Sequence, residues 1–315
     1  VAPNPMVGAV LVHQERIIGE GYHQEYGKPH AEVNCINSVA EADKVLVPDS
    51  TLYVSLEPCA HFGKTPPCAD LIIREGIKKV IIGCIDTTPK VNGKGVQKLK
   101  DAGIEVQIGI LEKECRDLNK RFFVFNAMKR PYIILKWAQS ANNKIGTEER
   151  RITISNQYTN ILVHKWRSEE SAIMVGNHTA QSDNPTLTNR FWSGKSPLRI
   201  VLAGNRPSAV LKMYVQPGET IVFNTQSNSQ EGSVRYVSVD PSNYLNEVLM
   251  HLYQNKIQSV LVEGGAQTHQ QFFDSGHWDE CRIITSKQMI IPVGIEAPKV
   301  PEMTLIKEEW LMQDF

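Results

Sequence analysis

The 315-residue sequence predicts an α/β protein built from two domains. Its length is about twice that of an ordinary domain, which suggests two separate hydrophobic cores. Short apolar runs alternate with helical patterns in both halves, and this alternation is typical of sheets covered by helices on both faces. A long helical pattern ends at Pro131, where a new apolar run begins. We therefore expect one domain at 1–128 and another at 129–315.

The first domain alternates predicted strands with predicted helices. The apolar runs indicate strands of a mostly parallel or mixed sheet. Two of the helical patterns end at glycines, as helices commonly do. The predicted strands are 7–12, 16–22, 51–56, 78–86 and 103–110. The predicted helices are 30–42, 67–76, 95–103 and 112–130.

The second domain shows the same alternation without repeating the first domain's sequence, so the two domains are expected to differ. Residues 224–233 are polar and predict a surface loop. The predicted strands are 131–138, 171–176, 198–204, 219–224, 234–239, 259–265 and 280–290. The predicted helices are 156–167, 242–255 and 266–275.

Composition and charge argue against several classes of protein. Lys plus Arg equals Asp plus Glu at 34 each, whereas a general nucleic-acid binder usually carries a basic surplus. No apolar stretch approaches the roughly 20 residues that cross a bilayer, and no secretory segment follows a basic start. The six cysteines suggest cytoplasmic thiols rather than a disulfide framework. We expect a cytoplasmic protein with no membrane or nucleic-acid partner. The sequence is compatible with either a monomer or a homo-oligomer.

A His-x-Glu motif and two cysteines form the first candidate site. His30, Cys59 and Cys68 offer one imidazole and two thiols, which leaves the fourth tetrahedral position of a catalytic zinc open. Helix starts are predicted beside His30 and Cys68, and helix N-termini favour thiolates. Glu32 can take a proton from an attacking water and deliver it to a leaving amine. This combination is typical of zinc deaminases.

Two other hypotheses use the same residues. A nucleoside- or polynucleotide-editing deaminase with an accessory domain would favour a short C-x-x-C, but eight residues separate Cys59 from Cys68. A structural zinc site would have a fourth protein ligand, and the remaining cysteines have no partner at ligand spacing. The insert adds His61 and Lys64, which suit an anionic substrate or are simply surface residues of a loop.

The second domain holds a candidate phosphate site. Gly264 and Gly265 lie between a predicted strand and a predicted helix, where backbone N–H groups can approach a phosphate closely. Arg167 and Arg190 could clamp a sugar phosphate through bidentate bonds. Both features also have a plain interpretation, since such a glycine turn often only connects elements and a single arginine is usually solvated.

Four segments of the first domain resemble one known family. They read PNPMVGAVLV, GYHQEYGKPHAEVN, LEPCAHFGKTPPCADLII and VNGKGVQKLKDAGIEVQIG. They are similar to the deaminase half of the bifunctional deaminase/reductases of riboflavin biosynthesis. The resemblance implies a cytidine-deaminase-like, three-layer α/β/α domain that uses Zn²⁺ to deaminate 2,5-diamino-6-(5-phosphoribosylamino)pyrimidin-4-one. The residues it implies for substrate contact are Asn4, His23, His61 and Lys64.

The second domain resembles the reductase half of the same family. The resemblance rests on PYIILKWAQS, SAIMVGNHTAQSDNPTLTNR, LRIVLAG and LVEGGAQTHQQFFDSGHWDE. It implies a dihydrofolate-reductase-like α/β fold in which NADPH reduces the ribosyl side chain to ribityl, with Asp183 giving polar assistance. The implied NADPH residues are Gln139, Thr179, Asp183, Gly265, Ala266, Gln267, Thr268, His269, Gln270 and Gln271. The implied substrate residues are Arg167, Leu187, Arg190 and Glu263.

One departure from the family pattern lies just after the strand predicted at 131–138. The family usually shows Ser-x-Asp-Gly-Lys here, whereas this chain has Asn142 and Asn143 in place of Asp-Gly. Two explanations stay open, a shortened loop near 146–150 and a weakened reductase.

Overall fold

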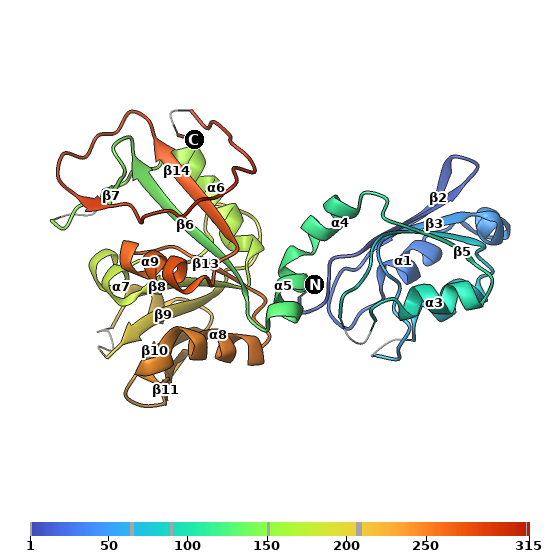
Figure 1. Cartoon of the computed structure of the whole chain (residues 1–315), viewed down its shortest axis with the longest axis horizontal. Coiled ribbons are helices and arrows are strands. Elements are labelled where there is room, and N and C mark those ends of the chain that lie inside the picture. The colour runs from blue at the N-terminus through green and yellow to red at the C-terminus, as the bar shows by residue number, and fades with distance from the viewer. Residues whose placement is uncertain (1, 64–65, 89–90, 150–151, 206–209, 313) are drawn as a thin grey trace. The chain divides into compact units, whose positions relative to one another are not determined.

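The chain divides into two compact units, Val1–Lys129 and Arg130–Phe315, shown in Figure 1. The computed structural model describes residues 2–63, 66–88, 91–149, 152–205, 210–312 and 314–315. Each unit has its own buried apolar cluster or clusters. Among these described residues, no helix combines the length and the apolar character that crossing a bilayer requires.

The first unit is built on a mixed five-stranded sheet, ordered β2-β1-β3-β4-β5. Strand β1 pairs antiparallel with β2 and β3, while β3, β4 and β5 run parallel, so the predicted mixed sheet is confirmed. The strands are β1 (Gly8–His13), β2 (Arg16–Tyr22), β3 (Thr51–Leu56), β4 (Lys79–Cys84) and β5 (Glu105–Ile108). The helices are α1 (Ala31–Asn37), a 3-10 helix (Glu41–Asp49), α2 (Cys68–Arg74), α3 (Lys94–Asp101), α4 (Glu112–Leu118) and α5 (Lys120–Met128).

Helices cover both faces of this sheet. Cys35 of α1 and Leu99 of α3 share one buried cluster with Ile82 of β4. Gly83, the next residue of the strand, points to the opposite face because side chains alternate along a strand. A Cβ added to Gly83 would lie 2.3 Å from the Cys115 sulfur of α4. The sheet is therefore the middle of three layers.

The single helix predicted at 112–130 is wrong, because the structure has two helices that meet at Asn119. The Asn119 side chain is buried, and its amide and carbonyl groups pair with the backbone O and N of Met6, both at 2.8 Å. This contact fixes Asn119 at a backbone geometry outside the helix, with φ −108° and ψ 15°. The partner lies 113 residues away, so the local pattern could not predict the break.

The second unit is built on an eight-stranded sheet, ordered β11-β12-β10-β9-β8-β13-β6-β14. All neighbours run parallel except β11 and β12. The strands are β6 (Tyr132–Ser140), β7 (Lys144–Gly146), β8 (Ala172–Gly176), β9 (Leu198–Gly204), β10 (Thr220–Asn224), β11 (Ser229–Glu231), β12 (Val234–Ser238), β13 (Ser259–Val262), β14 (Glu280–Ser286) and β15 (Ile295–Glu296). The helices are α6 (Gln157–Glu169), α7 (Asn177–Asp183), α8 (Tyr244–Gln254) and α9 (Ala266–Ser275), with 3-10 turns at Lys212–Val215 and Pro241–Asn243.

Two apolar clusters cover the two faces of this sheet. Met174 of β8 packs in one cluster with Leu252 of α8 and Phe272 of α9. Its neighbour Val175 packs in the other cluster with Ala180 of α7, as the alternation of side chains along a strand requires. Strands β7 and β15 form a separate two-stranded sheet.

Several details of the second unit differ from the prediction, and two of them have a clear physical reason. The surface loop predicted at 224–233 is wrong in part, because β11 lies within it and pairs with β12 at the edge of the sheet. All three β11 residues are exposed and polar, so no apolar alternation indicated a strand. Helix α7 was not predicted either, since its sequence NHTAQSD has no apolar periodicity.

Candidate active sites

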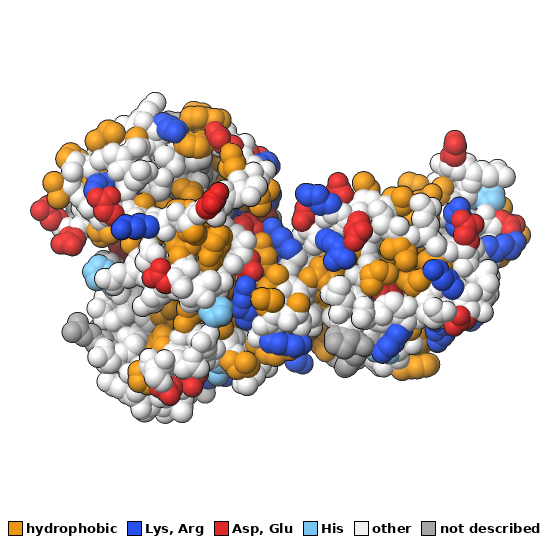
Figure 2. Space-filling view, in the orientation of Figure 1, with side chains coloured by type: hydrophobic (Ala, Val, Ile, Leu, Met, Phe, Trp, Pro, Cys, Tyr) orange, Lys and Arg blue, Asp and Glu red, His pale blue; other side chains and the backbone are white. Residues whose placement is uncertain are grey.

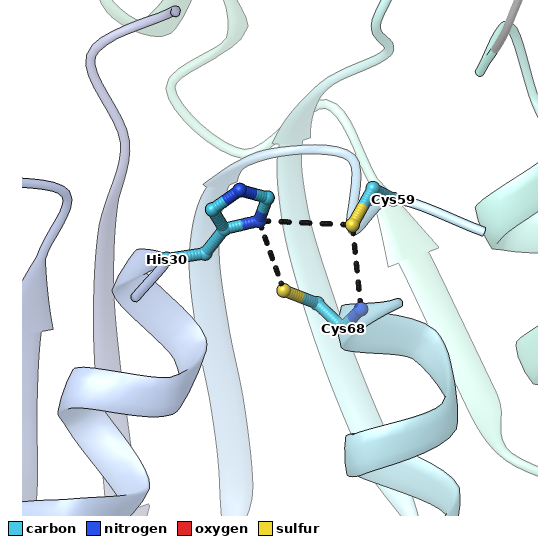
Figure 3. A group of neighbouring side chains, drawn as sticks. All are labelled: His30, Cys59 and Cys68. Atoms are coloured by element: carbon cyan, nitrogen blue, oxygen red, sulfur yellow. Dashed lines mark hydrogen bonds between the residues drawn. The ribbon is translucent and has the colours of Figure 1, made fainter. Parts of the chain in front are cut away.

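His30, Cys59 and Cys68 lie together at one end of the sheet of the first unit. The His30 Nδ1 atom is 3.7 Å from the Cys59 Sγ atom and 3.3 Å from the Cys68 Sγ atom, as Figure 3 shows. Their ligand atoms all lie within 4.8 Å of one another. An imidazole and two thiolates form a donor set that zinc prefers. Among the described residues, no fourth protein ligand joins this group.

Three different segments deliver these side chains. His30 is the residue directly before α1, Cys68 is the first residue of α2, and Cys59 lies on the chain that follows β3. The backbone N–H of Cys68 also donates to the Cys59 sulfur at 3.3 Å, which stabilises negative charge on that sulfur. The two cysteines are thus held together by the start of α2 before any metal binds.

The two thiols have opposite pKa shifts. Hydrogen bonding from Cys68 and from the His30 ring lowers the pKa of Cys59 to about 4. Hydrogen bonding to Cys59, burial and the charge of Glu32 raise the pKa of Cys68. The cysteine at a helix start, Cys68, is thus the one whose pKa is raised, whereas the lowered pKa belongs to Cys59 on the chain after β3. A divalent cation would supply the charge that stabilises the second thiolate.

Glu32 lies on α1, two residues after His30, and its side chain is buried. Burial raises the pKa of its carboxyl above the usual range. A carboxyl group with a raised pKa exchanges a proton more readily near neutral pH than an exposed one does. Glu32 therefore has both the position and the protonation behaviour of an acid/base group beside the metal ligands.

Asn4 and His23 lie next to this group. The His23 Nδ1 atom is 3.0 Å from the Pro29 carbonyl oxygen, and its Nε2 atom is 3.0 Å from the Asn4 amide nitrogen. Burial lowers the pKa of His23, which favours the neutral ring. Since a carbonyl only accepts, Nδ1 carries the proton and Nε2 accepts from Asn4. The His23 ring also packs edge-on against the His30 ring, with centroids 5.3 Å apart.

The insert between the cysteines is described only in part. His61 follows Cys59 by two residues and is exposed, so the structure leaves it accessible to a ligand. Lys64, the other residue predicted to contact the substrate here, lies outside the described residues.

Glu57, which was not among the predicted site residues, supports the segment that carries Cys59. Its buried carboxylate accepts from the backbone N–H groups of Gly93, Gly95 and Val96, at 2.9, 2.9 and 3.2 Å. These are N–H groups at the start of α3, which helical bonds leave unpaired. A Cβ added to Gly95 would lie 1.9 Å from the Pro58 carbonyl oxygen. The start of α3 therefore packs directly on the chain leading to Cys59.

A cavity of about 1940 Å³ opens in the second unit. It lies along the carboxyl ends of β8, β9 and β13, where ligands commonly bind in parallel sheets. Its volume exceeds the roughly 300–1,000 Å³ of a single small-molecule pocket, so it has room for two ligands. The predicted residues that line it are Arg167, Thr179, Asp183, Arg190, Glu263, Gly265, Ala266, Gln267, Thr268, His269 and Gln271.

Three predicted residues do not line this cavity. Gln139 bonds to the Trp137 ring nitrogen at 2.7 Å and to Asn143 at 3.1 Å. Leu187 is buried in the cluster beneath α7. The Gln270 side-chain amide of α9 donates to the Asp274 carboxylate at 2.8 Å. Their predicted roles in binding stay predictions.

The glycines before α9 allow close backbone packing. A Cβ added to Gly265 would lie 2.8 Å from the Thr179 Oγ1 atom of α7. A Cβ added to Gly176, at the end of β8, would lie 2.2 Å from the Thr268 Oγ1 atom. The start of α9 is thus pressed against α7 and β8, and its first N–H groups lie at the cavity wall, an arrangement that suits a phosphate.

Arg167 and Glu263 form a buried ion pair in the cavity wall. The two guanidinium bonds measure 2.8 and 2.7 Å. Burial alone would raise the pKa of Glu263, but the charges of Arg167 and Lys136 outweigh it and lower the pKa to about 2. Lys136 also lines the cavity, and burial lowers its pKa. Lys136 was not among the predicted site residues, although a lysine inside the apolar run YIILKWA was a usable signal.

Both units match known protein families. The model described as the cytidine and deoxycytidylate deaminase zinc-binding region matches residues 2–84, a range that contains His30, Glu32, Cys59 and Cys68. The model described as the RibD C-terminal domain matches residues 131–289.

Curated relatives match across most of the chain. The riboflavin biosynthesis protein RibD of Aquifex aeolicus is 39% identical over 297 residues, which cover 91% of this chain and 82% of that relative. RibD of Escherichia coli is 34% identical over 311 residues, which cover 91% of this chain and 83% of that relative. This chain belongs to the RibD family.

Solved structures of RibD proteins agree with this assignment. A Thermotoga maritima diaminohydroxyphosphoribosylaminopyrimidine deaminase/5-amino-6-(5-phosphoribosylamino)uracil reductase superposes with a TM-score of 0.90 at 36% identity, covering 99% of this chain and 90% of that one. Acinetobacter baumannii RibD superposes with a TM-score of 0.86 at 30% identity, covering 99% and 91%. The expected fold class, a cytidine-deaminase-like domain followed by a dihydrofolate-reductase-like reductase domain, is confirmed by the matches to a cytidine deaminase region and to the RibD C-terminal domain, and so are zinc and NADPH as the cofactors of the family.

Proposed function

We propose that this chain deaminates 2,5-diamino-6-(5-phosphoribosylamino)pyrimidin-4-one in residues 1–128 and reduces the product with NADPH in residues 129–315. One observation carries the proposal: a single chain of the RibD family holds both a zinc-type ligand group beside a buried glutamate and a large cavity with a phosphate-suited helix start. The cytoplasm as its compartment is part of the proposal, supported by cysteines whose spacing suits a metal site better than a disulfide framework.

In the deaminase unit, Glu32 moves the proton. Zinc held by His30, Cys59 and Cys68 would supply the Lewis acidity that activates water. Glu32 accepts a proton from the attacking water while the water oxygen bonds to the ring carbon. Glu32 then delivers that proton to the leaving amino nitrogen. The C–N bond breaks, ammonia leaves and a ring carbonyl remains. The proposed substrate contacts are Asn4, His23, His61 and Lys64.

In the reductase unit, the cavity positions two ligands. NADPH would supply the hydride that converts the ribosyl group, in its carbonyl form, to a ribityl chain. The α9 start and Thr179 would hold the cofactor phosphates, and Asp183 would give polar assistance near the reacting sugar. Arg190 would hold the substrate phosphate, with Arg167 and Glu263 beside the sugar. Gln139 and Gln270 are the remaining predicted NADPH residues, and Leu187 is the remaining predicted substrate residue.

The alternative of a nucleoside or polynucleotide deaminase with an accessory reductase-like domain is not favoured. The chain has no net charge, and Figure 2 shows lysine and arginine side chains interspersed with acidic ones on the face in view. Small phosphoribosyl-pyrimidines are therefore the proposed partners, without nucleic acid or membrane. Association of identical chains is compatible with the proposal.

Metal analysis paired with an NADPH-oxidation assay tests the proposal. The purified chain is expected to hold about one zinc ion and to release ammonia from the diaminopyrimidinone substrate. The deaminated product, supplied separately, is expected to drive NADPH oxidation. A chain that holds zinc but deaminates no phosphoribosyl-diaminopyrimidine contradicts the first half, and a chain that leaves NADPH unchanged contradicts the second.

A further inference from the structure

His164 connects α6 to the segment that carries Arg190. The His164 ring is buried in α6, and its Nδ1 atom accepts from the Arg190 backbone N–H at 2.9 Å. The ring packs edge-on against Phe191, with centroids 4.7 Å apart. His164 and Arg190 both line the reductase cavity. His164 was not among the predicted site residues.

The chemistry of this bond fixes the state of the ring. A backbone N–H only donates, so the His164 Nδ1 atom must be unprotonated and the ring neutral. Burial and the nearby charges of Arg167 and Arg190 lower the pKa of His164 to about 4, which keeps the ring neutral at physiological pH. His164 is therefore a permanent acceptor for Arg190 and is unsuited to donating a proton to substrate from that nitrogen.

A second bond from the same helix holds the same segment. Arg167, one helical turn after His164, donates to the Thr188 carbonyl oxygen at 3.1 Å. The Arg190 guanidinium donates to the Thr188 hydroxyl at 2.8 Å and to the Thr186 hydroxyl. Helix α6 thus fixes the backbone at Thr188 and at Arg190, and the threonine hydroxyls orient the guanidinium between these two anchors.

We propose that His164 is a positioning residue for Arg190, which sets where the guanidinium meets the substrate phosphate. This inference rests on the proposed function, because it takes Arg190 as the phosphate-holding group. Losing the acceptor would leave the Arg190 N–H without this partner and release one of the two backbone anchors. Since a small misplacement of a substrate clamp weakens binding strongly, the effect should fall on the phosphorylated substrate.

The test compares acceptor-free with acceptor-keeping variants in the full chain. His164→Phe and His164→Leu both remove the acceptor and keep apolar volume. Two variants are used so that the test still stands if one of them does not fold. His164→Asn places an amide oxygen near the Nδ1 position. NADPH oxidation is measured with the deaminated phosphoribosyl intermediate and with its dephosphorylated form. Removal of the acceptor is expected to raise KM about tenfold for the phosphorylated substrate, with kcat within about threefold, and to leave kcat/KM for the dephosphorylated form unchanged.

A double-mutant cycle separates positioning from general damage. In an Arg190→Ala background, adding His164→Phe should raise KM no further, because the group it positions is gone. His164→Asn should recover most of the wild-type KM. Equal losses for both substrates, or additive effects in the cycle, would overturn the role of His164 while leaving the proposed function standing. A wild-type chain that reduces neither substrate would overturn the proposed function and this inference with it.

Discussion

At the scale of a single residue, burial gives the Glu32 carboxyl the raised pKa that its proposed acid/base role needs. An exposed carboxyl would stay ionised near neutral pH, whereas burial raises the pKa of Glu32 and makes protonation accessible. Its place on α1, two residues after His30, brings the carboxyl to the metal ligands without making it one of them. Neutral and charged forms are then both available during one reaction.

Glu32→Gln should abolish deamination while the protein keeps its zinc. The amide has nearly the same volume, so the buried site should still fold, but it cannot carry a proton. We expect deaminase kcat to fall by about 10²–10⁴-fold, with zinc content and NADPH oxidation unchanged. The measurement is ammonia release beside metal analysis, with the exposed Glu41→Gln as the matched control. Concurrent loss of reductase activity would count against separate sites.

His269 gives a pH dependence to stability. Its ring is buried against Trp137, its Nε2 atom lies 3.1 Å from the Val262 carbonyl oxygen, and burial lowers its pKa to about 4. The unfolded chain takes up a proton near the ordinary pKa of about 6.5, before the folded chain does. Stability contributed by the neutral ring is therefore lost as pH falls from about 6.5 towards 4.

Urea unfolding between pH 7 and pH 4.5 should show this loss, and His269→Gln should reduce it. The glutamine amide can still donate towards Val262 but does not titrate. As pH falls, the free energy of unfolding should decrease more steeply for the wild type than for the variant. The two slopes should differ by at most about 1.4 kcal/mol per pH unit. Parallel pH profiles for the two proteins would show that His269 does not titrate in this range.

Asn143 shows how a departure in sequence is accommodated by the backbone. The residue has φ 59°, a left-handed geometry in which asparagine is the most tolerated residue after glycine. Its neighbour Asn142 bonds to both backbone groups of Ile291, at 2.8 and 3.1 Å. Two asparagines thus form the turn at the place where the resemblance led us to expect Asp-Gly.

At the scale of helices and strands, the first turn of α3 holds the chain that leads from β3 to the metal ligand Cys59. The Glu57 carboxylate accepts hydrogen bonds from backbone N–H groups at the start of α3. Because Gly95 has no side chain, the helix can pack against Pro58. The helix therefore sets the path of the chain that delivers Cys59, although none of its own residues is a metal ligand.

Gly95→Ala should weaken zinc binding. The new Cβ would lie 1.9 Å from the Pro58 carbonyl oxygen, so the helix or the Cys59 segment must shift. We expect about a tenfold or larger loss in zinc affinity, measured by competition with a chelator. Gly8→Ala in the same unit is the control, because nothing lies within 4 Å of its added Cβ. Equal zinc affinity in both variants would contradict the proposed role of α3.

Local sequence patterns predicted the elements that bury an apolar face and missed those set by distant contacts. Strands β2, β3 and β9 have the predicted bounds, because alternation and flanking turns are local signals. The break at Asn119 depends on Met6, and β11 depends on the edge of β12, so neither could be predicted locally. In the sites, motif residues were predictable, whereas Glu57 and His164 act through backbone N–H groups that carry no motif.

The two units have separate apolar cores at the scale of the whole molecule. No residue belongs to a cluster of both units in the described part of the chain. Zinc ligands occur in one unit and the reductase cavity in the other. Each cofactor should therefore stabilise its own unit, because a ligand stabilises the folded state that it binds.

Calorimetry should resolve two unfolding transitions that respond to different ligands. Zinc removal should lower one transition, and NADPH at about 100 times its Kd should raise the other by several degrees. Separately expressed units are unnecessary, since the full chain reports both transitions. A single transition that moves with zinc and with NADPH alike would contradict independent cores.

The pairing of Asn4 with His23 has a consequence for how a pyrimidine is recognised. A neutral imidazole has one lone pair to offer, and the Asn4 amide already occupies it. An incoming amino group must displace that amide or bind its free oxygen instead. In the proposed site the two residues would therefore work in series: Asn4 would contact the ring, and His23 would link that contact to the Pro29 carbonyl next to His30.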